Sequence, residues 1–485
     1  MPPTDDCSRD ELLALIAGQH QTITSQDQTI SLLQERVADL ERRLGRNSGN
    51  SSLPPSTDDR PGVNRAARRG AKPTGRKRGK QPGAPGSGLG FVADPDVRVD
   101  HFPDGTCPCG TPLAGATNGG VIGSHQVHDV PPVTVTVTQH DRHQVRCRCG
   151  RVHKASRPPL VLAAASSYGP NIQALVCYLL VFQHLPVHRA AALIADLTGA
   201  KPSAGYVHSM LARGAAALTE VTTTIRAQII ASPVVGFDET TLRVGPAGTK
   251  KHVLSANTDL LTAFWLGGRD LATFHAFGIL DAFTGVAVHD RYTVYDHPDF
   301  GHLAGHQLCA AHLIRDLADA AESWPDQHWP GQADRALRAL ISSWHQALAA
   351  GDHAVTGPAA AAQRALLAQA VIVGLSQIPR NHRRGAKQLP ARNLLECLRD
   401  READVLRFLS DTRVPPTNNI SERGLRPEKT QQKISGRLTS EATTRHRLTL
   451  RSYLSTAAKH NINMMSALRD AITGNPWTPP TAAFI

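Results

Sequence analysis

The stretch VVGFDETTLRV, residues 234–244, determines the fold that the sequence predicts. Its β-branched and apolar residues, bounded by polar breaks, are typical of a short buried strand, and this strand carries Asp238. Two more strands are predicted directly after it, at KKHVLSAN and LLTAFWLG. LATFHAFGILDAF then predicts a helix, and GVAVHDRY predicts a fourth strand. Three strands, a helix and a strand, in that order, indicate an α/β fold.

Two more acidic residues stand out further along the chain. Asp290 ends the fourth strand in GVAVHDRYTVYD. Glu422 follows the segment PPTNN, which breaks the preceding structure and predicts the start of a helix. Two strands and a nearby helix can hold three carboxylates around a pair of Mg²⁺ ions. We therefore predict a metal site at Asp238, Asp290 and Glu422. Glu239 is a poor ligand candidate because neighbouring residues of a strand face opposite sides.

Each carboxylate also has a structural alternative. Asp238 can cap a turn, and Asp290 can pair with Arg291 or with another nearby basic residue. Asn419 and Glu422 have the spacing of a capping box, in which the glutamate bonds back to the N-cap amide. Two nearby acids are fallback candidates for the second carboxylate, Asp296 and Asp299. The alternatives differ in which side chains contact each carboxylate.

The long interval between the second and third carboxylates is predicted to be structured. Residues from about 308 to 410 are Ala-rich and have a helical pattern, which indicates a helical insertion. We expect an RNase H-like α/β catalytic core over residues 232–460 that contains this insertion. Residues 461–485 are expected to form a C-terminal tail.

Composition and charge limit the partners. A chain of 485 residues predicts roughly two to four domains. The net charge of +12 favours a polyanionic partner, nucleic acid before acidic lipid. No apolar run approaches the roughly 18 residues of a membrane span, and the first residues lack the pattern of a signal peptide. We therefore expect a cytoplasmic protein without membrane contacts.

Residues 1–45 predict a coiled coil. Apolar residues recur every seven positions, at Ile16, Ile23, Ile30, Val37 and Leu44, and the row three residues on contains Leu12, Leu33 and Leu40. β-Branched residues in one row and leucines in the other favour a parallel two-stranded coil, so a homodimer or higher oligomer is expected. The alternative is a helix that packs onto the protein's own core.

Residues 46–95 predict a basic linker that is too polar to bury a core. Its cations include four predicted DNA contacts, Arg76, Lys77, Arg78 and Lys80. Such an arm can neutralise phosphates, so its contribution to DNA affinity should fall steeply with salt. The alternative is a tail that only increases solubility.

Residues 96–155 predict a small zinc-binding module. Four of the eight cysteines form two pairs of the form C-x-C-G, at Cys107, Cys109, Cys147 and Cys149. Four thiolates from two such turns can hold one tetrahedral Zn²⁺ ion. Between them, the alternation in VPPVTVTVTQH predicts a strand. Two unrelated cysteine pairs are the alternative.

Residues 160–228 have a helical pattern. Ser203 is a plausible N-cap for a helix that runs from Tyr206 to Leu218. With the helix before it, this could be a helix-turn-helix that places its second helix in the major groove of DNA. Plain packing of short helices explains the same pattern.

The chain resembles the DDE transposases of bacterial insertion sequences, most closely the insertion sequence sixty-six family. The resemblance runs nearly end to end. It rests on the zipper, LGRNSGNSSLPPSTD, the basic GRKRGKQPGAPG, the cysteine pairs, FDET, D-x-Y-x-x-Y from Asp290 to Tyr295, Cys309-x-x-His312 and NNISERGLRP, in that order. The resemblance implies catalytic roles for Asp238, Asp290 and Glu422, and a zinc finger at the cysteine pairs.

The expected chemistry is phosphoryl transfer with two Mg²⁺ ions, in which the protein binds the ends of its element, cleaves DNA and joins it to a target. Cys309 and His312 are expected to support the site, although their spacing also fits a nucleophile and its base.

Four cations after Glu422 are predicted phosphate contacts, Arg423, Arg426, Lys429 and Lys433. The alternative functions are a catalytically inactive DNA-binding repressor or targeting protein, and a nuclease that cleaves without joining. Accessory proteins encoded by the same element are possible partners.

Overall fold

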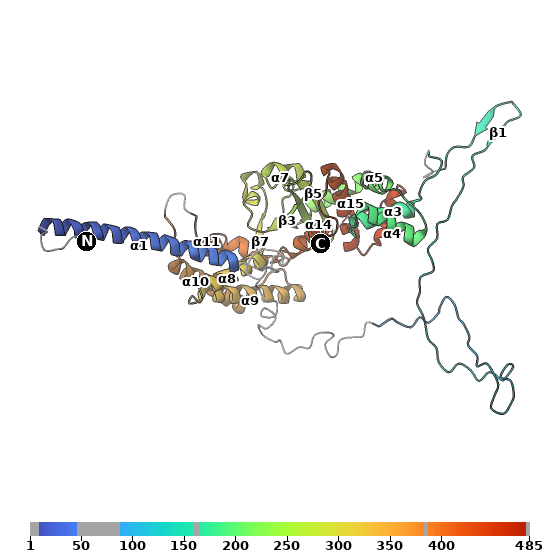
Figure 1. The fold of residues 1–485 in the computed structure, drawn as a ribbon, viewed down its shortest axis with the longest axis horizontal. Coiled ribbons are helices and arrows are strands. Elements are labelled where there is room, and N and C mark those ends of the chain that lie inside the picture. Colours follow the sequence, from blue (N-terminus) through green and yellow to red (C-terminus); the bar gives the residue numbers. More distant parts are fainter. Residues whose placement is uncertain (1–8, 46–87, 159–163, 383–386, 482–485) are drawn as a thin grey trace. The chain divides into compact units, whose positions relative to one another are not determined.

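A computed structural model describes residues 9–45, 88–158, 164–382 and 387–481 (Figure 1). It mixes helices with a five-stranded sheet, which agrees with the predicted α/β class. The predicted DNA contacts Arg76, Lys77, Arg78 and Lys80 lie outside the described residues. Residues Arg9–Gly45 form one 37-residue helix, α1. The apolar residues of its predicted seam are exposed, among them Ile16, Ile23, Ile30, Leu33 and Val37.

The predicted strand at VPPVTVTVTQH, residues 130–140, is wrong. These residues have no regular structure, and Val133, Val135 and Val137 are exposed. A strand needs a neighbour to receive its backbone hydrogen bonds, and no described strand pairs with this segment. The strands nearby are β1 (Gln144–Arg146) and β2 (Val152–Lys154), which form an antiparallel hairpin.

The main sheet contains the four predicted strands and one more. The strand order is β5-β4-β3-β6-β7, antiparallel from β5 to β3 and parallel from β3 to β7. The strands are β3 (Val234–Leu242), β4 (Lys251–Asn257), β5 (Thr262–Gly267), β6 (Val286–His289) and β7 (Gly305–Leu308). The helix before β6 is shorter than predicted, because α7 (Leu271–Phe277) ends at Gly278 in the left-handed conformation.

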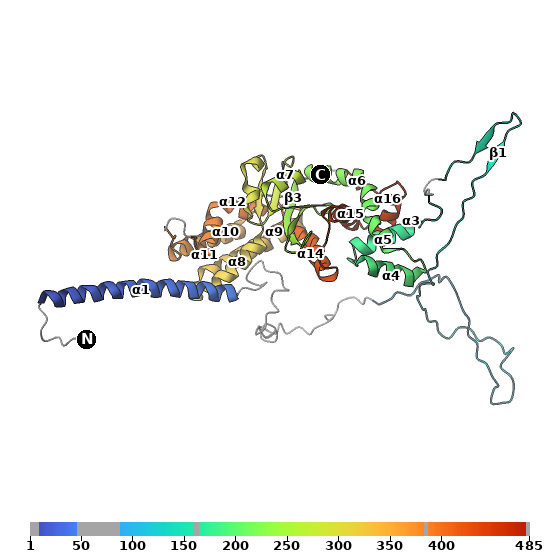
Figure 2. The same cartoon turned by 45° about the horizontal axis from the view of Figure 1, so that its top comes forward.

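The helices before the sheet share one hydrophobic core with it. They are α3 (Pro170–Val181), α4 (Val187–Thr198), α5 (Ala204–Ala216) and α6 (Thr219–Ile230). Val235 and Phe237 of β3 belong to the same buried cluster as these helices. The Ser203 N-cap is confirmed, since its side chain accepts a hydrogen bond from Tyr206 N–H at 3.2 Å. Because α5 packs on α3 and on α15 (Glu441–Lys459), packing accounts for its apolar face (Figure 2).

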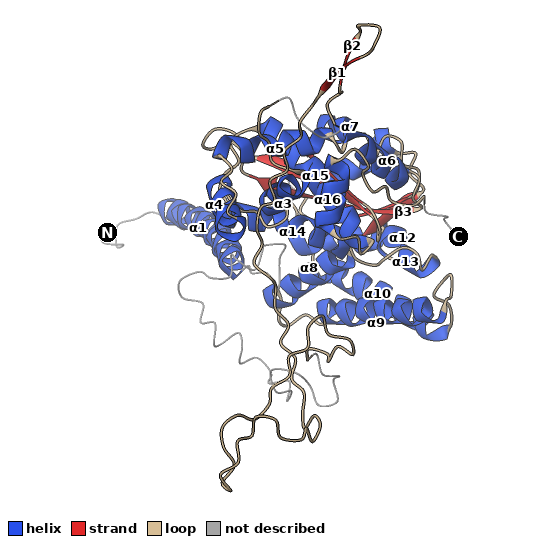
Figure 3. Ribbon diagram, turned by 90° about the vertical axis from the view of Figure 1, so that its right-hand side faces the viewer, coloured by secondary structure: helices blue, strands red, loops and turns tan. Residues whose placement is uncertain are grey.

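Helix α15 closes the outer edge of the sheet. The Thr262 and Phe264 N–H groups of β5 donate to the hydroxyls of Thr456 and Ser452 on α15, at 3.1 and 3.0 Å. An edge strand otherwise leaves such groups unpaired, so these hydroxyls take the place of a further strand. Helices lie around the strands of the main sheet (Figure 3). Residues 461–485 are more than a tail, because α16 (Met464–Ile472) packs on α3.

The helices predicted after β7 form a subdomain with its own core. They are α8 (Ala310–Ser323), α9 (Trp329–Ala350), α10 (Pro358–Gln377), α11 (Pro390–Asp400), α12 (Glu402–Val405) and α13 (Arg407–Ser410). Trp329, Leu337 and Leu395 are fully buried in this core. By length and composition, α10 is the one described helix that could cross a membrane. Its Leu367 and Val371 are buried in this core.

Candidate active site

Strand β3 presents Asp238 towards helix α14 (Asn419–Ile434). Gly236 lies on the same face of β3 as Asp238, because side chains alternate along a strand. A Cβ atom on Gly236 would lie 2.6 Å from Ser421 Oγ and 2.8 Å from Asn418 Oδ1. The Asn418 side-chain amide also donates to Phe237 O at 2.5 Å. The absence of a side chain at Gly236 therefore lets the start of α14 approach the strand beside Asp238.

We expect Gly236→Ala to lower stability by about 1–3 kcal/mol, because an added methyl group would displace α14 from β3. The matched control is Gly205→Ala on α5, where a Cβ meets nothing within 4 Å. Alanine there should be neutral or stabilising by up to about 1 kcal/mol. Urea denaturation of both variants measures the difference, and equal midpoints would contradict this close approach.

Asp290 is aligned with Asp238 in the register of the two neighbouring strands. β3 and β6 pair in parallel with Gly236 opposite Val288, so the register continued by two residues aligns the two aspartates. Tyr292 N–H donates to Asp290 Oδ1 at 2.8 Å, which orients that carboxylate. The alternative pairing of Asp290 with Arg291 is wrong, because Arg291 instead forms an ion pair with Asp316 on α8.

Glu422 approaches from α14. The N-cap of this helix is Asn418, so Glu422 is at the fourth helical position and not at the third position that a capping box requires. Its carboxylate oxygens lie 3.8 Å from His312 Nε2 and 3.8 Å from Arg315 Nη2. Glu422 Oε1 is buried without a hydrogen-bond partner among the described residues. An oxygen in this state is available to a metal ion.

The electrostatics of Asp238 favour a cation. Burial raises the pKa of the Asp238 carboxyl well above its usual range, and the negative charges of Glu239, Asp290 and Glu422 raise it further. Among the described residues, no Lys, Arg or His forms an ion pair with Asp238. A divalent ion between these carboxylates would supply the positive charge that the protein does not.

Glu239 faces the opposite side of β3, as the alternation predicts. Its carboxylate pairs with Arg269 at 2.7 Å and accepts a hydrogen bond from the Tyr295 hydroxyl at 3.0 Å. Burial and the charge of Asp290 raise the pKa of Glu239. Its oxygens are thus engaged by protein groups.

Cys309 connects the strands to the start of α14. Its N–H donates to His289 O at 2.9 Å, and its Sγ accepts a hydrogen bond from Asn418 N–H at 3.1 Å. Burial raises the pKa of the Cys309 thiol to about 11, so the thiol stays protonated at neutral pH. The contacts suit a residue that fixes the first turn of the helix carrying Glu422.

The fallback carboxylates have other partners. Asp296 pairs with Arg401 at 2.9 Å, and Asp299 lies 3.1 Å from His275 Nε2. The acidic residues that mainly raise the pKa of Asp238 are instead Glu239, Asp290 and Glu422. The structure therefore brings together Asp238, Asp290 and Glu422, and leaves the fallback pair outside this group.

Comparison with protein families identifies the chain. The family model described as transposase IS66 family matches residues 165–446, more than half of the chain. The chain belongs to the transposase IS66 family. A family of unknown function (DUF6444) matches residues 1–89, and no curated protein matches the chain. Membership suggests transposase activity, DNA as partner and the use of a divalent metal.

In this family member, α14 has a basic face beside Glu422. Its cations recur every three or four residues and are exposed, at Arg423, Arg426, Lys429 and Lys433. The opposite face is buried through Ser421, Leu425, Glu428 and Gln431. One helix thus carries a carboxylate of the site and a row of cations in solvent.

The two cysteine motifs of the chain have the same local geometry. In each, the N–H of the first cysteine donates to the carbonyl four residues later, Thr111 O at 2.9 Å and Arg151 O at 2.8 Å. Gly110 and Gly150 have a φ of +87° in both turns. Each turn supplies two of the four predicted ligands, and the zinc site stays a prediction.

Sequence reasoning missed Arg315. It follows His312 by three residues on α8, so both side chains project from one face of the helix towards Glu422. The signal was present as the spacing Cys309-x-x-His312-x-x-Arg315.

Proposed function

We propose that the protein binds the ends of its insertion sequence and catalyses Mg²⁺-dependent DNA cleavage and strand transfer at Asp238, Asp290 and Glu422. The observation that carries the proposal is the convergence of these carboxylates from β3, the end of β6 and α14, with no described cation paired to Asp238. A bound cation would allow these buried carboxylates to stay ionised beside one another.

The proposed core is RNase H-like. Three antiparallel strands followed by two parallel ones support it, with the helical insertion over about 308–410 between the second and third carboxylates. The remaining domains keep their predicted roles: a zipper over 1–45, a basic linker over 46–95, a zinc module over 96–155 and a helical domain over 160–228. We place the protein in the cytoplasm.

The carboxylates fit two Mg²⁺ ions, since carboxylate oxygens are the ligands that Mg²⁺ prefers. Asp238, Asp290 and Glu422 would hold these ions. A bound metal would supply activation of the attacking hydroxyl group and stabilisation of the leaving oxygen. Tyr292 N–H orients the Asp290 carboxylate by a hydrogen bond. Cys309 holds the start of α14, the helix that contains Glu422. Arg423 and Arg426 can position the phosphate backbone.

The test is an assay of purified protein with labelled element ends, a target plasmid and Mg²⁺, with EDTA as control. Products joined to the target, formed only with Mg²⁺, are expected. Cleavage without joining would favour the nuclease. Binding without any product, even after the neighbouring gene products are added, would favour the inactive repressor.

We expect α1 to dimerise the protein through its exposed apolar seam. Ile23 and Ile30 are 56% and 52% exposed in the single chain, so a second copy can bury them. The double variant Ile23→Asn/Ile30→Asn should sediment as a monomer where the wild type is a dimer or larger, because two polar residues destabilise the seam. Thr24→Asn/Ser25→Asn, off the seam, is the matched control. Equal oligomers in all three proteins would contradict the zipper.

A further inference from the structure

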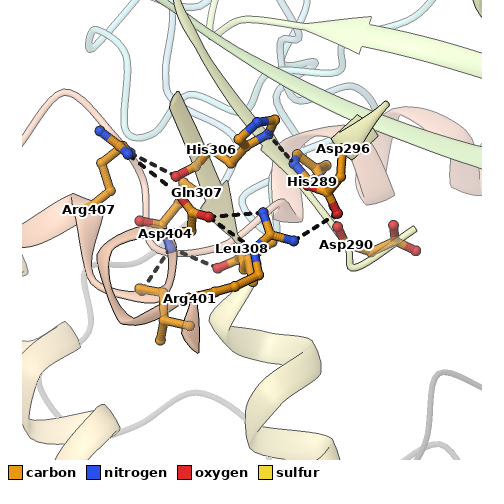
Figure 4. Close-up of polar contacts among 10 residues, drawn as sticks. His289, Asp290, Asp296, His306, Gln307, Leu308, Arg401, Asp404 and Arg407 are labelled. Atoms are coloured by element: carbon orange, nitrogen blue, oxygen red, sulfur yellow. Dashed lines mark hydrogen bonds and ion pairs between the residues drawn. The ribbon is translucent and has the colours of Figure 1, made fainter. Parts of the chain in front are cut away.

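Two histidines and an aspartate form a second cluster next to Asp290 (Figure 4). His289 is the last residue of β6, His306 lies in β7, and Asp296 ends the 3₁₀ helix η3 (Thr293–Asp296). One ring nitrogen of each histidine and one carboxylate oxygen lie within 4.8 Å of one another. We propose that this cluster binds one transition-metal ion of the Zn²⁺ class, separate from the ions of the carboxylate site.

The ligand types determine the class of ion. Imidazole nitrogen with carboxylate oxygen is a donor set for Zn²⁺ and similar ions, whereas Mg²⁺ takes oxygen ligands and water. His289 Nε2 and His306 Nδ1 share a hydrogen bond at 3.0 Å, and this separation is close to that of two nitrogen ligands on one ion. The three carboxylates and this cluster therefore select different ions.

The orientation of His289 is that of a metal ligand. Its Nδ1 donates to the backbone carbonyl of Asp290, which leaves Nε2 with its lone pair directed at His306. Metal-binding histidines commonly donate their second nitrogen to such a carbonyl. The ring is fully buried and stacks on Tyr295, with ring centroids 4.3 Å apart.

Asp296 can serve the ion while it keeps its protein partner. Arg401 donates to its Oδ2 at 2.9 Å, and among the described residues no donor contacts Oδ1. The charge of Arg401 is offset by Asp404, which it pairs with at 2.9 Å (Figure 4). An ion here would connect β6, β7 and η3. One of its ligands, His289, is the residue directly before Asp290 in the sequence. Its role would be structural, and its binding does not depend on the proposed catalytic function.

The test is zinc binding by the full-length protein. Wild type, His306→Gln and His345→Gln are dialysed to equilibrium against Zn²⁺ and their metal content is measured. Glutamine keeps a hydrogen-bonding group opposite His289 but is a poor zinc ligand, and His345 is an exposed histidine of α9. We expect His306→Gln to bind one zinc ion fewer than wild type, and His345→Gln to match wild type. Equal zinc content in all three would overturn the proposal.

Two further measurements separate this site from the cysteine pairs and from misfolding. With Co²⁺, thiolate ligands give a near-ultraviolet charge-transfer band, which His306→Gln should retain while it loses visible absorption from the second ion. Asp296→Asn, at a partly exposed side chain, should weaken zinc binding at this site by about 10-fold or more. Unchanged affinity in Asp296→Asn would also overturn the proposal, even if His306→Gln fails to fold.

Discussion

Asp238→Asn is expected to abolish cleavage and strand transfer, and to raise the melting temperature of the metal-free protein. Loss of a group that organises transition-state charge costs about 10²-fold or more in rate. The stability gain follows from the raised pKa of the Asp238 carboxyl in the folded state, caused by burial and by neighbouring negative charges. Such a group lowers stability increasingly as pH rises above its unfolded pKa, and asparagine removes this effect.

Thermal unfolding with and without Mg²⁺ tests both parts of this expectation. Mg²⁺ should stabilise wild type and not Asp238→Asn, because the variant lacks one of the carboxylates that would hold the ion. Asp334→Asn is the matched control, since Asp334 pairs with Arg338 on α9 at 2.8 Å. If Asp238→Asn still joins DNA, or if Mg²⁺ stabilises it as much as wild type, Asp238 is not a metal ligand of the active site.

The sequence predicted those strands whose pattern is local. β3 to β6 show apolar and β-branched runs of sufficient length, and all four are present. β7 was missed because its four residues, GHQL, include no β-branched residue. Its buried Gln307 bonds to Val405 O at 3.0 Å and Phe408 N at 2.9 Å, about a hundred residues away. Such pairing depends on tertiary contacts that no local pattern records.

The residues of the site were predictable by type and spacing, but their partners were not. Residue order alone suggested that Asp238, Asp290 and Glu422 belong together, and the register of β3 and β6 aligns the first two. The capping-box alternative for Glu422 failed by one position, because α14 is capped by Asn418. Contacts of Glu422 with Arg315 join helices more than a hundred residues apart, which periodicity within one helix does not predict.

Glu428→Ala is expected to destabilise the fold by about 3–5 kcal/mol, because it breaks a buried ion pair and leaves its partner charged. Glu428 on α14 is fully buried and pairs with Arg447 on α15. Arg447 also donates to His184 Nδ1 at 2.8 Å, and the neighbouring Arg451 is buried. Burial lowers the pKa of Arg451 to about 10, with Glu428 opposing this shift. Without Glu428, the buried guanidinium groups of Arg447 and Arg451 would therefore repel each other without a neighbouring negative charge.

Urea denaturation of Glu428→Ala beside Glu441→Ala measures this effect. Glu441 pairs with Lys251 at 2.9 Å, but its side chain is 44% exposed, so its loss should cost no more than about 1 kcal/mol. Similar midpoints for the two variants would show that the buried pair contributes no more than an exposed one. A much lower midpoint for Glu428→Ala would show that this pair holds α14 on α15, and so holds the helix that carries Glu422 in place against the sheet.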